Sequence, residues 1–171
     1  MTKISQPRQL LALEQAAARQ RDAIVRHANR TVLILRDARG LKENQIRNVV
    51  NVAGTIESIE GLLNFIRYQI ARERSWQAKR DPKGLDFGHQ VIEDIRTAVH
   101  EAACAAADAA AARLGDADRD ALYEEAYLRL AEEYLGYLNR GFVYCEKFEN
   151  GGGYARMEAY VQAMRECKHD T

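Results

Sequence analysis

The sequence predicts an all-α protein, a compact bundle of five to six helices in a single domain over residues 1–171. Three observations support this prediction. Apolar residues recur with a period close to 3.6, and no alternating run of useful strand length occurs. The chain contains only two prolines, so it has few helix breakers. Its 171 residues, 47% of them hydrophobic, suffice to bury a real core.

Three helices are expected in the first half. The first begins at Pro7, where the missing N–H costs nothing, and continues toward Leu35. A short helix covers about 43–53. Thr55 is expected to cap the third helix, over about 56–79. The third helix is expected to bury one apolar stripe, made of Ile59, Leu62, Leu63, Ile66 and Ile70.

The second half begins after a loop of turn-forming residues, Arg80-Asp-Pro-Lys-Gly-Leu-Asp86. Asp86 is expected to cap a helix over about 87–114, whose alanine-rich second half has maximal helix propensity and lets neighbours approach closely. A stop at Gly115 precedes a long helix over about 118–148. Three consecutive glycines break that helix, and a last helix covers about 154–167.

The net charge is zero, because 25 Lys and Arg balance 25 Asp and Glu. The balance is uneven along the chain. Residues 1–80 hold 15 basic and 7 acidic side chains and carry +8, whereas residues 81–171 carry −8. We call these segments the basic half and the acidic half. Zero net charge therefore does not argue against a polyanionic partner.

Membrane and secreted classes receive no support from the sequence. No apolar run approaches the roughly 18–20 residues that span a bilayer, and the N-terminal residues lack the apolar core of a signal peptide. Cys104, Cys145 and Cys167 are widely spaced and form no CxxC pair. The expectation is a cytoplasmic protein without disulfides or membrane contact.

Catalytic and metal-binding motifs are sparse. The Glu-x-x-His spacing of di-iron bundles occurs once, at Glu166 and His169, whereas such a centre needs two copies and two further glutamates. His100 and Cys104 supply only two of the three or four ligands that zinc needs. No phosphate loop, Gly-x-Ser-x-Gly or dinucleotide fingerprint is present. We expect no catalytic residue, metal or cofactor, and hence no enzyme.

Five tyrosines fall on one face of the expected 118–148 helix. Aliphatic residues share this face, and glutamates lie on the same helix, so we interpret the stripe as core rather than as a stacking surface for bases. An exposed stripe would instead be a second interface. The stripe consists of Tyr123, Tyr127, Tyr134, Tyr137 and Tyr144.

Two polar stripes in the basic half resemble RNA-binding surfaces. One on the expected 56–79 helix lies opposite the apolar stripe, and a shorter one lies on the 43–53 helix. Arg and Lys neutralise phosphates, Asn hydrogen-bonds sugar and phosphate oxygens, and Tyr can stack on a base. The alternative is an ordinary solvated helix face. The stripes comprise Asn64, Tyr68, Arg72, Ser75 and Lys79, and Arg47, Asn48 and Asn51.

Three short segments resemble the small helical subunit of type III-A CRISPR–Cas effector complexes, in the order found in that family. Leu41-Lys-Glu-Asn-Gln-Ile-Arg-Asn48 is similar to its L-T-T-S-Q-I-R opening. Ile66-Arg-Tyr-Gln-Ile-Ala-Arg72 resembles its hydrophobic-Tyr-x-x-(Gly/Ala)-Arg segment. Tyr154-Ala-Arg-Met-Glu-Ala-Tyr-Val-Gln-Ala163 resembles its closing Y-x-E-A-x-V-A-Y helix. Together the three quoted segments cover 25 residues of the chain.

The sequence departs from that pattern at two places. Lys42-Glu43-Asn44 replaces the usual hydroxyl pair, and Ala163-Met164 replaces the closing Ala-Tyr. The chain is also longer than expected for that family, because of its alanine-rich helix and its acidic helix over 116–149. The related type III-B small subunit, or a divergent type III relative, therefore stays open.

The resemblance implies a non-catalytic structural subunit that contacts guide or target RNA. It further implies other effector subunits as partners and copies of the chain in a head-to-tail array, where unlike charges would face each other. Carried over by position, Gln45, Arg47 and Arg72 are its RNA-contact candidates. The charge pattern alone adds Arg67, Arg74, Lys79 and Arg80. The competing hypothesis is a helical protein–protein adaptor whose basic half docks an acidic protein.

Overall fold

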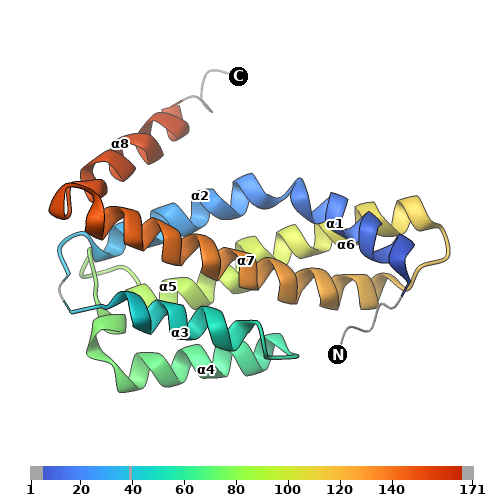
Figure 1. Ribbon diagram of the computed structural model, residues 1–171, viewed down its shortest axis with the longest axis horizontal. Helices are drawn as coiled ribbons and strands as arrows, with labels where there is room; N and C mark the ends of the chain where they lie inside the picture. Colours follow the sequence, from blue (N-terminus) through green and yellow to red (C-terminus); the bar gives the residue numbers. More distant parts are fainter. Residues whose placement is uncertain (1–5, 39, 167–171) are drawn as a thin grey trace.

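Helices make up nearly all of the chain that the computed structural model describes, residues 6–38 and 40–166, and these residues contain no strand (Figure 1). The α-helices are α1 (Pro7–Ala18), α2 (Arg21–Val32), α3 (Glu43–Ala53), α4 (Ile59–Arg72), α5 (Phe87–Asp94), α6 (His100–Leu114), α7 (Arg119–Lys147) and α8 (Gly153–Glu166). A π-helical turn, Ile95–Val99, joins α5 to α6. The described residues thus form seven continuous helices, which confirms the all-α prediction with one helix more than expected.

The centre of the bundle is the pair α6 and α7, which pack against each other along their length. Helix α1 lies on α6, α2 and α3 lie on α7, and α4 packs on α5 and more lightly on α3 (Figure 1). Helix α8 contacts α7 and α2 and then extends away from the bundle at its left-hand end. Buried side chains of all eight helices form one continuous core.

Alanines let α6 sit close to its neighbours. Ala103, Ala106 and Ala107 are fully buried between α6 and the helices α1 and α7. Because alanine adds only a methyl group, helix backbones can approach more closely there than over larger side chains. The alanine-rich segment therefore packs within the subunit and forms its centre.

Two expected helices have different bounds from those predicted. The first is divided into α1 and α2 by a tight turn at Arg19 and Gln20. The second, α4, is shorter at both ends than the helix expected over 56–79. Ser58, and not Thr55, caps α4 by accepting a hydrogen bond from the Gly61 N–H at 3.0 Å.

Helix α4 ends at Arg72 because the chain turns inward to bury a tryptophan. Glu73 is extended, and a short 3₁₀ turn, η2 (Arg74–Gln77), follows. Trp76 is fully buried, and its ring centroid lies 5.3 Å from that of Phe87. The Gln77 side-chain amide donates to the Ile70 carbonyl at 2.8 Å, which satisfies one carbonyl of the last turn of α4.

The π-helical turn between α5 and α6 adjoins a buried carboxylate. Asp94, only 4% exposed, accepts hydrogen bonds from Thr31 of α2 at 2.5 Å and from Tyr134 of α7 at 2.7 Å. The Tyr127 hydroxyl donates to the Ile95 carbonyl at the start of the π turn, at 2.9 Å. These bonds join α2, α5 and α7 at the middle of the bundle.

The tyrosine stripe of α7 is core in its middle and exposed at its end. Tyr127 and Tyr134 are buried, and Tyr123 and Tyr137 are partly buried against the core. Tyr144 is 40% exposed and stacks on Phe148, with the ring centroids 5.3 Å apart. The core prediction is therefore confirmed for the stripe except at Tyr144.

The basic and acidic halves of the sequence are not separate in space. Helices of the basic half pack directly on α5, α6 and α7 of the acidic half. Arg21 donates to Glu133 at 2.8 Å, and both Arg36 and Arg80 pair with Glu158 of α8. Part of the opposite charge is thus neutralised within the chain, which weakens the charge argument for a head-to-tail array.

Candidate nucleic-acid interface

Helix α3 presents a polar face to solvent because most of its apolar residues point the other way. Ile46, Val49 and Ala53 are buried, and α3 packs on α7. The opposite face consists of exposed polar side chains, as the helical period predicts. They are Asn44, Arg47, Asn48 and Asn51.

Helix α4 is built in the same way. Its buried residues include Leu62, Leu63, Ile66 and Ile70, which fix its orientation on α5 and α3. The opposite face carries Asn64, Arg67, Tyr68 and Arg72, all exposed. We call these four residues, together with Arg47, Asn48 and Asn51 of α3, the α3–α4 surface.

The most distinctive feature of this surface is an exposed tyrosine beside an arginine. Tyr68 is 52% exposed, so about half of its surface is open to solvent. One turn later, Arg72 donates from Nη1 to the Tyr68 hydroxyl at 3.2 Å, and its guanidinium carbon lies 5.9 Å from the ring centroid. The Phe65 ring lies beside it, at 6.2 Å between centroids.

Gln45 is occupied within the protein. Its side-chain oxygen accepts a hydrogen bond from the Lys42 N–H at 2.8 Å, which caps α3, and its amide donates to Glu73 at 3.1 Å. Ser75 also donates to the Gln45 oxygen, at 3.4 Å. Gln45 therefore ties the start of α3 to the end of α4, and its side chain is not offered to a ligand.

Arg47 is exposed but engaged in an ion-pair network. It pairs with Glu43 one turn earlier, and Glu43 in turn accepts from Lys147 of α7 at 2.7 Å. The hydrogen bond from the Lys147 amine is the main reason that the pKa of Glu43 lies below its usual range. Arg47 thus faces solvent beside a carboxylate that partly neutralises it.

The expected stripe on the 56–79 helix ends at Arg72. Ser75 and Lys79 do not continue it, because the chain has already left the helix to bury Trp76. Arg74 is exposed on η2, and Lys79 is exposed in the following loop. Arg80, which the charge pattern also proposed as an RNA contact, pairs with Glu158 of α8.

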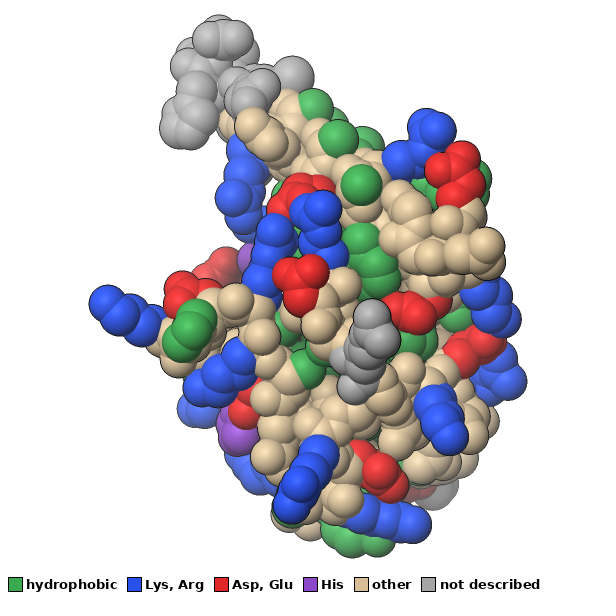
Figure 2. Space-filling view, turned by 90° about the vertical axis from the view of Figure 1, so that its left-hand side faces the viewer, with side chains coloured by type: hydrophobic (Ala, Val, Ile, Leu, Met, Phe, Trp, Pro, Cys, Tyr) green, Lys and Arg blue, Asp and Glu red, His purple; other side chains and the backbone are tan. Residues whose placement is uncertain are grey.

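The end of the molecule that holds η2 and α8 carries charges of both signs. Figure 2 shows this end, where Lys and Arg side chains project around the rim and Asp and Glu side chains lie between them. The described residues form no unbroken basic patch on this face. On the α3–α4 surface, Arg47 pairs with Glu43 and Arg72 pairs with Glu73. This surface therefore relies on its aromatic and amide side chains as well as on positive charge.

Sequence patterns miss Lys147 as a neighbour of the interface. It lies 104 residues from Glu43 and belongs to the acidic half, yet it brings a positive charge to the α3 side of the molecule. The same limit applies to Glu73, whose carboxylate holds Gln45 in place. Only the tertiary packing of α3 on α7 and α4 places these residues.

The part of the chain that the structure describes holds no group of three or more His, Cys, Asp or Glu residues placed to hold a metal ion. The Glu166 and His169 pair falls outside this part, since His169 is not among the described residues. Among the described helices, none is long and apolar enough to cross a membrane.

Comparisons with known proteins find no counterpart. No family model, no curated protein and no solved structure matches the chain.

Proposed function

We propose that the chain is a non-catalytic RNA-binding subunit of a type III CRISPR interference complex, and that the α3–α4 surface contacts the RNA. The exposed Tyr68 ring with Arg72 bonded to its hydroxyl carries this proposal. The three sequence segments that resemble the small subunit of such complexes support the choice of assembly. Two of the three segments contribute to α3 and to α4.

The chemistry of this surface suits single-stranded RNA. An aromatic ring on which a base stacks contributes about 1–3 kcal/mol per base. Arg67 and Arg72 project from the same helix, within reach of the flanking phosphates. The exposed amides of Asn51 and Asn64 can bond ribose and phosphate oxygens.

The charge on this surface predicts modest affinity for a single copy. Arg47 faces Glu43, and Arg80 is paired with α8, so fewer arginines are free for phosphate than the +8 of the basic half suggests. A subunit of this kind holds RNA firmly when other effector subunits, or further copies along the same strand, share the contact. Effective concentration then supplies affinity that one copy lacks.

Binding to a fluorescent single-stranded RNA, measured by anisotropy across a series of salt concentrations, tests the proposal. Replacing both Arg67 and Arg72 by Ala is expected to weaken binding about tenfold or more. The log–log salt slope should fall in magnitude by about 1.4, since each phosphate contact on a single strand contributes about 0.7.

Tyr68 separates stacking from charge in the same assay. Tyr68→Ala is expected to lose about 5- to 100-fold in affinity without a change in salt slope, whereas Tyr68→Phe keeps the stacking. Arg113→Ala, on α6 and away from α3 and α4, is the matched control for charge. Equal affinity and slope in the wild type and the Arg67/Arg72 variant would contradict the proposal and favour the adaptor hypothesis.

A further inference from the structure

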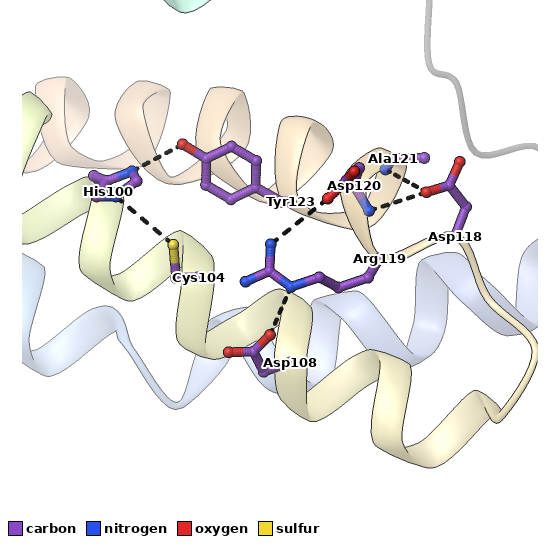
Figure 3. A network of polar contacts seen from close by, with 8 residues as sticks. All are labelled: His100, Cys104, Asp108, Asp118, Arg119, Asp120, Ala121 and Tyr123. Carbon is purple, nitrogen blue, oxygen red and sulfur yellow. Dashed lines mark hydrogen bonds and ion pairs between the residues drawn. The ribbon is translucent and has the colours of Figure 1, made fainter.

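A thiol, an imidazole and a guanidinium meet where α6 packs on the first turns of α7, away from the α3–α4 surface. Figure 3 shows Cys104 between His100, one turn earlier on α6, and Arg119 at the start of α7. Cys104 is partly exposed, as is His100. The proposed RNA contact makes no use of this cluster.

His100 contacts two other members of the cluster, one through each of its ring nitrogens. Its Nε2 lies 3.8 Å from the Cys104 sulfur, and its Nδ1 lies 2.8 Å from the Tyr123 hydroxyl oxygen. The His100 ring is further held edge-on against Tyr123, with the centroids 5.7 Å apart. The imidazole is therefore fixed in orientation by a residue of the neighbouring helix, with one nitrogen directed at the thiol.

Arg119 completes the cluster from the other side. Its Nε donates to Asp108 at 2.8 Å, and its guanidinium carbon lies 5.9 Å from the Tyr123 ring centroid. The pKa of Arg119 is raised, chiefly by the hydrogen bond to Asp108 and in smaller part by contact with Cys104. Arg119 thus brings a positive charge, paired with Asp108, to the side of the cluster opposite His100.

This arrangement has the parts of an activated nucleophile. A thiol becomes reactive when a neighbouring base can take its proton and a cation stabilises the thiolate. In the tautomer in which Nδ1–H donates to the Tyr123 oxygen, Nε2 is free to accept the proton of the Cys104 thiol. Tyr123 then has the role of the third group that orients the base.

We propose that Cys104 is a redox modification site that reacts with small-molecule disulfides of the glutathione class. His100 takes the thiol proton, and the Cys104 thiolate attacks one sulfur of the disulfide. The disulfide bond breaks as the new bond between Cys104 and that sulfur forms, and the departing thiolate takes the proton from His100. The products are a mixed disulfide on Cys104 and one small-molecule thiol, so the small disulfide is the oxidant.

Cys145 offers an internal comparison within the same chain. It is fully buried on α7, and burial raises the pKa of its thiol to about 12. The neighbouring charge that acts on this thiol is Glu146, which also raises its pKa. It represents the structural type of cysteine, which reacts slowly because it is both inaccessible and protonated.

The test follows the reaction of the folded protein with oxidised glutathione by mass spectrometry, in a background with Cys167 replaced by Ser. Cys104 is expected to form its mixed disulfide at least about tenfold faster than Cys145. His100→Gln and Arg119→Gln should each slow the Cys104 reaction severalfold to about tenfold. His89→Gln, which replaces an exposed histidine whose ring bonds to Asp86, is the matched control and should leave the rate unchanged.

The pH dependence distinguishes a base from a merely structural histidine. The ratio of the Cys104 rates at about pH 8.5 and about pH 6.5 should be larger in His100→Gln, which depends on the solvent to remove the thiol proton. Equal rates at Cys104 and Cys145 would overturn the proposal. So would His100→Gln and Arg119→Gln variants that fold and react like the wild type. Either failure leaves the RNA proposal untouched, because the two sites lie on different helices.

Discussion

Asp94 is a carboxylate inside the bundle, and its partners explain why it stays charged. Burial by itself would raise the pKa of Asp94, but the His27 imidazole 3.8 Å away and hydrogen bonds from Thr31, Tyr134 and Gln90 together lower it below the usual value. Four side chains from three helices therefore bind the ionised form more strongly than the protonated form. The ionised Asp94 carboxylate therefore joins α2, α5 and α7.

Replacing Asp94 by Asn is expected to destabilise the protein by about 2–4 kcal/mol at neutral pH, because hydrogen bonds to a buried charge are worth about 1.5–3 kcal/mol each. Urea unfolding measures this change. Glu93→Gln, which removes the neighbouring exposed carboxylate, is the control and should cost little.

The sign of the pH dependence follows from the lowered pKa. Below the unfolded value, near 3.9, the unfolded chain binds more protons at this residue than the folded protein does. The contribution of Asp94 is therefore fully present above that value and is lost as the pH falls through the folded pKa. The Asp94→Asn variant should lack this part of the acid dependence. An unchanged acid dependence in the variant would show that Asp94 is not the group responsible.

At the scale of helices, one close contact holds α4 against α5 and so sets the α3–α4 surface. A Cβ atom added at Gly88 would lie 2.3 Å from the Cγ1 of Ile70 and 3.2 Å from the carbonyl oxygen of Trp76. Gly88→Ala is expected to destabilise the protein by about 1–3 kcal/mol, since overpacking forces side chains or backbone to move.

A second glycine provides the comparison for Gly88. Gly136 lies within α7, and a Cβ there would meet only the end of the Arg140 side chain, at 3.5 Å. Gly136→Ala should therefore stabilise the helix by about 0.5–1 kcal/mol. Thermal unfolding of both variants checks the contrast. Equal effects at the two positions would show that the contact of α5 with α4 is not close.

Local signals predict the helices well, and long-range packing accounts for the differences. The cap at Asp86 is confirmed, because capping depends on residues within three positions. The end of α4 is not predictable in this way, since it depends on burial of Trp76 against Phe87. The π turn after Asp94 is missed for the same reason.

The same distinction between local signals and long-range packing applies to the candidate interface. Exposure of Asn48, Arg67 and Tyr68 follows from the helical period, which places the apolar residues on the opposite face. The hydrogen bonding of the Gln45 side chain within the protein does not follow from the helical period, because its partner Glu73 lies 28 residues away. The pairing of Arg80 with a glutamate 78 residues away is equally invisible in the sequence.

At the scale of the whole molecule, the net charge is zero, but the arginines of the basic half have two different roles. Some arginines of the basic half bind glutamates of the acidic half and help to hold the bundle together, at up to about 1 kcal/mol for each exposed pair. Others, on the outer face of α4, remain directed to solvent. One of them, Arg72, also pairs with Glu73 at 3.6 Å. RNA binding therefore depends on where the exposed arginines lie, and the net charge gives no measure of it.

Ultraviolet cross-linking of the protein to single-stranded RNA, followed by mass spectrometry of the cross-linked peptides, tests the RNA-binding claim most directly. We predict that the main adduct lies on Tyr68 or its neighbours in α4, and that Tyr68→Ala removes it. Cross-links confined to α6 and α7, with none on α3 or α4, would contradict the account.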